Sequence, residues 1–101
     1  MENVSAEQVK QLQAEGKKLL VDYWATWCGP CKSLIPRLET LESQYPNITF
    51  VKVNVDENTD AALALGIRSV PTVLIYDGEN LINRSTGVNI DSVYTKILDT
   101  L

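Results

Sequence analysis

The chain has 101 residues, of which 45% are hydrophobic and 22% charged, so it has the size and composition of one soluble globular domain over residues 1–101. Its net charge of −4 argues against nucleic acid or an anionic membrane as a partner, since both attract basic patches. No apolar run approaches the roughly 18 residues of a membrane-spanning helix, and the N-terminus does not resemble a targeting peptide. We therefore expect a cytoplasmic protein.

The first predicted elements are a helix and a buried strand. Ser5 and Gln8 form a capping box, which predicts that a helix runs over 4–15. A nearly unbroken apolar run at 19–25 is too short for a helix. It predicts a central strand that is buried on both faces, as parallel strands usually are.

A helix, a strand and a short helix are predicted next. Apolar residues at spacings of three and four predict a helix over 28–45, with one face toward the core. Alternating valines predict a strand over 48–55. A short helix is expected over 58–65, with Asn58 as its N-cap.

The C-terminal part predicts a hairpin and a last helix. Strands at 72–76 and 81–86 flank a turn cluster at 77–80. Asn89 is expected to cap the final helix. Crossover helices make the earlier strands parallel, and the hairpin adds an antiparallel neighbour. The fold class is therefore α/β, with a mixed central sheet of four strands and four helices on both faces.

The two cysteines, Cys28 and Cys31, lie where the buried strand meets the following helix. Two cysteines and no histidine cannot form a closed zinc site, and Lys32 excludes the Cys-x-x-Cys-His pattern of haem attachment. A structural disulfide remains an alternative, although closing so small a loop removes little unfolded-state entropy. The pair therefore favours redox chemistry and predicts no metal site.

The helix start explains why these thiols could react. Unpaired N–H groups and the positive end of the helix dipole lower the pKa of a thiol at Cys28, and the thiolate is the nucleophile. Cys31, one turn later, can attack the resulting mixed disulfide. Gly29 and Pro30 carry no charge that would stabilise the reduced pair, so the protein is predicted to donate electrons.

The stretch Trp24-Ala25-Thr26-Trp27-Cys28-Gly29-Pro30-Cys31-Lys32 resembles the active-site signature of the thioredoxin family. Further matching landmarks are Asp22, Pro36, Lys52, Val70-Pro71-Thr72, Gly78 and Gly87. The resemblance covers almost the whole chain and implies a thioredoxin fold and a protein disulfide reductase. Thioredoxins usually begin with a strand, but only about four residues precede Ser5, so a fifth, N-terminal strand is expected to be short or absent.

The resemblance also implies the partners. They are disulfide-containing client proteins and a thioredoxin reductase, and the protein is expected to be a monomer. No bound cofactor is implied, because the redox-active Cys28–Cys31 disulfide itself carries the electrons.

The resemblance implies a proton acceptor for Cys31 at Asp22, with Lys52 as its partner. Burial in an apolar strand would raise the Asp22 pKa toward neutrality, as a general base requires. Alternatively, Asp22 is a structural carboxyl that is held by hydrogen bonds, and Lys52 is a solvent-exposed lysine on a strand.

A client-binding surface is also implied by the resemblance. The Val70–Pro71 bond would be cis and lie beside the cysteines, so that an extended client segment could pair with the Val70 backbone. Pro71 could instead simply begin a strand, and Gly87 could be only a turn residue. The residues expected to bind the client are Trp27, Gly29, Pro30, Val70, Pro71, Gly87 and Val88.

Two rival functions remain at this stage. One is a disulfide isomerase or oxidant of the same fold, and the other is a protein-binding module whose thiols are idle. The midpoint potential measured against glutathione discriminates the first rival, and a double Cys-to-Ser variant discriminates the second.

Overall fold

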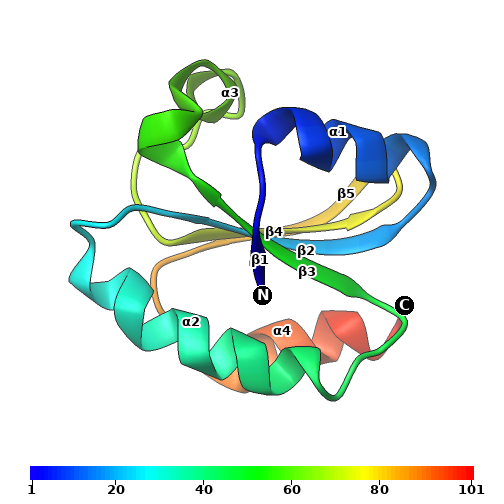
Figure 1. Ribbon diagram of the computed structural model, residues 1–101. Helices are drawn as coiled ribbons and strands as arrows, with labels where there is room; N and C mark the ends of the chain where they lie inside the picture. Colours follow the sequence, from blue (N-terminus) through cyan, green and yellow to red (C-terminus); the bar gives the residue numbers. More distant parts are fainter.

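One five-stranded mixed sheet runs through the centre of the computed structural model, which describes residues 1–101 (Figure 1). Its strands are β1 (Glu2–Asn3), β2 (Lys18–Trp24), β3 (Thr49–Asn54), β4 (Thr72–Asp77) and β5 (Asn80–Thr86). The α-helices are α1 (Ala6–Ala14), α2 (Gly29–Glu42), α3 (Thr59–Ala64) and α4 (Asp91–Leu98). The strand order in space is β1-β3-β2-β4-β5, in which the first three run parallel and β4 and β5 are antiparallel to their neighbours. This confirms the predicted fold class.

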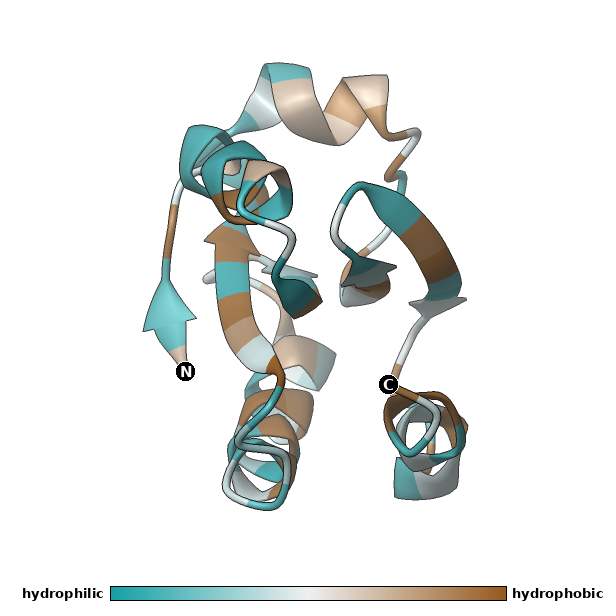
Figure 2. Cartoon of the chain, turned by 90° about the vertical axis from the view of Figure 1, so that its right-hand side faces the viewer, coloured by the Kyte–Doolittle hydropathy of each residue, from teal (hydrophilic) through white to brown (hydrophobic).

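The helices cover the sheet in two layers, α1 and α3 on one face and α2 and α4 on the other (Figure 1). Figure 2 shows both layers from the side, with apolar stretches in the strands between them. None of the helices combines the length and apolar composition that crossing a bilayer requires. The core on the α2 and α4 side contains Leu20, Leu34, Leu38, Leu41, Phe50, Val73, Ile75, Tyr94 and Leu98. The core on the other side contains Val9, Leu19, Val21, Tyr23, Val51, Val53, Leu74 and Tyr76.

The position of β2 in the middle of the sheet explains why its sequence is almost entirely apolar, because a hydrophobic core covers each of its faces. Leu20 packs into the α2 and α4 core, while its neighbours Leu19 and Val21 pack into the opposite one. Side chains alternate along a strand, so Asp22 lies on the same face as Leu20. A carboxyl group is therefore buried on the face that α2 covers.

The N-terminal segment is correctly predicted in its main features. The capping box is confirmed: Ser5 accepts a hydrogen bond from the Gln8 N–H, and the Gln8 side chain accepts one from the Ser5 N–H. The N-terminal strand exists but has only two residues, which pair with Val51 and Lys52 of β3. Most of the outer edge of β3 therefore has no strand beside it.

Of the two asparagines predicted as helix caps, one is placed correctly and one is not. Asn58 is the N-cap residue of α3, as predicted, although its side chain makes no capping hydrogen bond. Its oxygen instead accepts the Ala6 N–H at 2.9 Å, and its amide donates to the Asn54 carbonyl. Asn89 is one residue too early, since Ile90 is the N-cap of α4, and the Asn89 amide donates to the Thr86 and Gly87 carbonyls. The Asn58 side chain thus joins separate segments, which a local sequence pattern does not reveal.

Candidate active site

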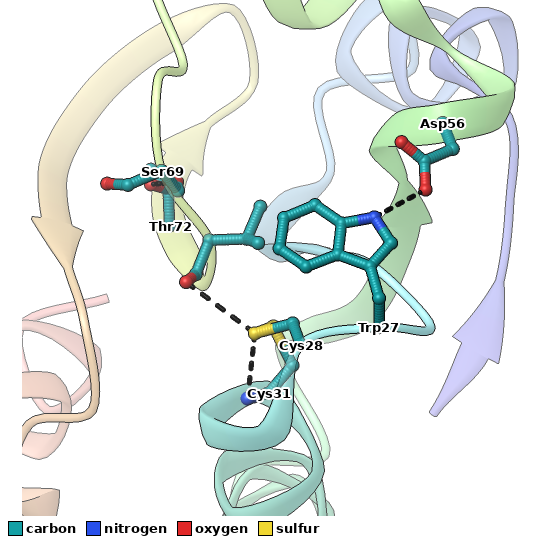
Figure 3. The surroundings of a disulfide bond; sticks show 7 residues. Trp27, Cys28, Cys31, Asp56, Ser69 and Thr72 are labelled. Atoms are coloured by element: carbon teal, nitrogen blue, oxygen red, sulfur yellow. Dashed lines mark hydrogen bonds between the residues drawn. A yellow bond between two sulfur atoms is a disulfide. The ribbon is translucent and has the colours of Figure 1, made fainter.

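A disulfide joins Cys28 and Cys31 at the start of α2 (Figure 3). Cys28 is the N-cap residue, and its sulfur accepts a hydrogen bond from the Cys31 N–H at 3.1 Å. Pro30 lies in the first turn of α2, where its missing N–H leaves no hydrogen bond unmade. The Cys31 N–H and the helix dipole would stabilise negative charge on the Cys28 sulfur after reduction.

The two sulfurs differ in their access to other molecules. Cys28 is 4% exposed, whereas Cys31 is fully buried, and both belong to a small buried cluster with Ala25. The Cys28 sulfur is 3.6 Å from the carbonyl oxygen of Val70. Cys28 is therefore the less enclosed of the two cysteines.

Trp27 forms an exposed apolar surface beside the disulfide. Its indole is 69% exposed, and its Nε1–H donates to the Asp56 carboxylate at 2.8 Å (Figure 3). A hollow of about 100 Å³ lies between this ring and the segment 67–70. Sequence reasoning misses Asp56, because nothing in its local sequence indicates a partner 29 positions away. Its hydrogen bond holds a large apolar ring in place at the surface.

The segment that contains Pro71 closes the other side of the site. The Val70–Pro71 bond is cis, as the resemblance implied. The Pro71 carbonyl accepts the Gly87 N–H at 2.8 Å, which joins two loops beside the cysteines. Gly87 has φ +82°, a conformation that favours glycine. Gly87 is therefore both a turn residue and a link to Pro71.

The residues predicted to bind a client differ in their exposure. Trp27, Gly29, Pro30 and Val88 are exposed, Val70 and Gly87 are half-buried, and Pro71 is buried. These residues come from segments 27–30, 70–71 and 87–88. The first segment lies in the N-terminal half of the chain and the last in the C-terminal half, and the fold brings both to the end of the sheet where α2 begins (Figure 1).

Asp22 is fully buried, and neither of its carboxylate oxygens has a hydrogen-bond partner. Burial raises the pKa of this carboxyl from 3.8 to about 7, although the positive charge of Lys52 opposes the rise. The alternative interpretation of Asp22 required hydrogen bonds that hold the carboxyl in place, and the structure has none. A group with this pKa can accept or release a proton near neutral pH.

Lys52 lies directly opposite Asp22 in the register of β2 and β3. Its side chain is half-buried, and its ammonium group lies 4.9 Å from the centre of the Trp24 ring, within the range of a cation–π interaction. Lys52 is therefore held in place and is not a freely exposed lysine.

The site contains sulfur and carboxyl groups but no set of metal ligands: no group of three or more His, Cys, Asp or Glu side chains lies close enough to hold an ion.

Comparison with known proteins identifies the family. A sequence model described as "Thioredoxin" matches residues 2–99. The chain belongs to the thioredoxin family. It is 37% identical to the thioredoxin of Mycoplasma genitalium over 95 residues, which cover 94% of this chain and 90% of that one. It is also 41% identical to thioredoxin-2 of Saccharomyces cerevisiae over 86 residues, which cover 84% and 83% of the two chains.

Solved thioredoxin structures are similar over the full chain. Mitochondrial thioredoxin 3 of Saccharomyces cerevisiae, in its oxidised form, has a TM-score of 0.89 and 32% identity, covering 100% of this chain and 95% of that one. Fasciola hepatica thioredoxin has a TM-score of 0.87 and 30% identity, covering 98% of both. The Cys28–Cys31 pair is thus the redox pair of a thioredoxin, a thiol-disulfide oxidoreductase that reduces disulfides.

Removing the charge of Lys52 is expected to raise the pKa of Asp22 in this thioredoxin further above about 7, because that charge lowers it. Lys52→Met should therefore shift the titration of the Asp22 carboxyl carbon to higher pH in an NMR experiment. Lys17→Met, which removes an exposed lysine just before β2, is the matched control. A titration that is unchanged or shifted to lower pH would mean that Lys52 does not act on Asp22.

Proposed function

We propose that Cys28 attacks the disulfide of a client protein and that Cys31 resolves the mixed disulfide. The Cys28 thiolate bonds to one client sulfur, and the other client sulfur leaves as a thiolate. The Cys31 thiolate then attacks the Cys28 sulfur, which forms the Cys28–Cys31 disulfide and releases the second client thiolate. The client gains two electrons, and the thioredoxin is left oxidised.

The difference in access between the two sulfurs carries this assignment of roles. Cys28 keeps a small exposure of 4% whereas Cys31 has none, and the Cys28 sulfur is the one that accepts an N–H at the helix start. Cys31 lies behind it, within reach of the Cys28 sulfur but shielded from solvent. This arrangement favours attack by Cys28 and protects Cys31 until a mixed disulfide has formed.

Asp22 is proposed as the group that accepts the Cys31 proton, so that Cys31 can attack as a thiolate. Two observations support this role: Asp22 lies on the sheet face beneath α2, and its pKa is about 7. A base with a pKa near the working pH transfers protons efficiently. Lys52 is proposed to tune this pKa through its charge.

The client segment is proposed to lie across the surface around Cys28. The Val70 N–H makes no hydrogen bond within the chain, so it is free to pair with an extended segment. Trp27, with its hydrogen-bonded indole, offers a fixed apolar contact. The proposed surface comprises Trp27, Gly29, Pro30, Val70, Pro71, Gly87 and Val88.

The rival of the same fold, an oxidant or isomerase, makes the opposite prediction about direction. Gly29 and Pro30 provide no positive charge beside Cys28 that would stabilise the reduced pair. We expect a midpoint potential lower than that of the glutathione couple, measured by equilibration in glutathione buffers and thiol labelling. A potential above that couple would support the oxidant or isomerase instead.

A thioredoxin reductase is proposed to restore the dithiol, with electrons from a flavin or an iron–sulfur cluster in that partner. Mixing the oxidised protein with each purified class of reductase and its electron donor would identify the source. A donor dithiol needs a reducing compartment, and we propose the cytoplasm, with residues 1–101 acting as one monomeric domain.

A further inference from the structure

Arg37, on the side of α2 that faces α4, holds the segment leading into α4. Its Nε and Nη2 donate to the same Asp91 carboxylate oxygen at 3.1 and 2.7 Å. Nη2 also donates to the backbone carbonyl of Asn89. These partners are more than 50 residues away in sequence, so one guanidinium joins α2 to a distant loop. The planar guanidinium suits such a combination of bonds better than a lysine ammonium does.

The segment 87–90 has few other attachments to the rest of the protein. At its start the Gly87 N–H bonds to Pro71, and the Asn89 side chain bonds only to nearby carbonyls. Val88 is 42% exposed and Ile90 is 71% exposed, so neither is anchored in the core. Ile90 also provides no side-chain cap for α4. Arg37 is therefore the only side chain from outside the segment that bonds to it.

The position of Arg37 on α2 links this segment to the thiols. The same helix begins at the redox pair, and Arg37 follows Cys31 by six residues, about 9 Å along the axis. The connection from β5 to α4 contacts α2 through Arg37. Helix α2 thus connects the redox pair to the residue that bonds segment 87–90.

We propose that Arg37 is a positioning residue for client recognition, which holds segment 87–90 so that Val88 and Ile90 contact a client protein beside Cys28. This rests on the proposed client surface, which includes Gly87 and Val88. Without Arg37 the segment would be mobile, and a client would have to order it on binding. A small disulfide does not reach the segment and would not be affected.

The expected effect is a change in client affinity with unchanged thiol chemistry. For Arg37→Met, the protein-disulfide concentration that gives half the maximal rate should rise about tenfold, as the loss of charged hydrogen bonds and the added ordering cost predict. The limiting rate, and the rate with bis(2-hydroxyethyl) disulfide, should stay within about twofold of the unaltered protein.

The experiment mixes pre-reduced protein with increasing amounts of a purified disulfide protein and follows the single turnover by tryptophan fluorescence. Lys18→Met is the matched control. Lys18 also donates to a backbone carbonyl, that of Leu101, but it lies at the start of β2, at the opposite end of this strand from the cysteines. Arg37→Lys should lie between Arg37→Met and the unaltered protein. Asp91→Asn should have a smaller effect than Arg37→Met, since it keeps the bond to the Asn89 carbonyl.

A second readout measures the segment directly. Amide hydrogen exchange at 88–90 should be faster in Arg37→Met than in Lys18→Met. If Arg37→Met does not fold, Arg37→Lys and Asp91→Asn provide the same comparison.

Two results would overturn the inference: client kinetics of Arg37→Met equal to those of Lys18→Met, or equal slowing with protein and small disulfides. If the unaltered protein reduces the small disulfide but no protein disulfide, the proposed function itself fails.

Discussion

Cys31→Ser is expected to accumulate a lasting mixed disulfide between Cys28 and a client protein, whereas Cys28→Ser is expected to accumulate almost none. Serine at position 31 cannot attack the mixed disulfide, so the covalent complex persists. Serine at position 28 leaves only a fully buried thiol, which a client disulfide cannot reach. Both changes should lower turnover by at least about a thousandfold, as the removal of essential nucleophiles does.

The measurement is a non-reducing gel with mass spectrometry, after each variant has been mixed with a purified protein that has one accessible disulfide. The double Ser variant is the control for non-covalent association. Equal trapping by both single variants would show that access does not decide which sulfur attacks, and the assignment of roles would be wrong.

Asp22→Asn is expected to slow reduction of a disulfide substrate and, at the same time, to stabilise the fold at high pH. The folded pKa of about 7 lies above the unfolded value of 3.8, so ionisation of Asp22 opposes folding. This penalty is absent below pH 3.8, grows between the two pKa values and is complete above about pH 7. Asparagine does not ionise and removes the penalty.

The comparison of two pH values isolates the ionisation from the cost of burying an amide. The increase in the free energy of unfolding that Asp22→Asn causes, relative to the unaltered protein, should be about 2–3 kcal/mol larger at pH 8 than at pH 5. Urea melts at both pH values measure this difference. Turnover should fall most near neutral pH, where Asp22 would accept the Cys31 proton.

An Asn variant whose relative stability is the same at pH 5 and pH 8 would show that Asp22 keeps an ordinary pKa. A variant with full activity would show that another group takes the proton. The second result would leave Asp22 as a buried acid without a catalytic role.

The elements of the fold follow from local sequence where the relevant contacts are themselves local. Ser5 and Gln8 cap their own helix, and the apolar run of β2 needs only burial on both faces to explain it. The strand over 48–55 ends one residue early, because the Asn54 side chain accepts the Asp56 N–H and a short 3-10 helix, η1 (Val55–Glu57), begins there. Such side-chain competition shifts element ends by a residue or two.

The site is predictable only in part, for the same physical reason. The thiols are close in sequence, and an acid in an apolar strand is conspicuous without any structure. Trp27 bonds to Asp56, and Arg37 bonds to Asn89 and Asp91. Each of these hydrogen bonds joins residues that are 29 or more positions apart. No periodicity or motif within one element contains that information, and only the packed fold brings these groups together.

The central claim is that the two sulfurs transfer electrons to protein disulfides. The most direct test compares the pre-reduced unaltered protein with the Cys28→Ser/Cys31→Ser double variant, by counting the thiols that appear on a purified client. We predict two client thiols for each molecule of unaltered protein oxidised, and none above background with the double variant. Equal activity of the two proteins would contradict the claim and would favour a binding module whose thiols are idle.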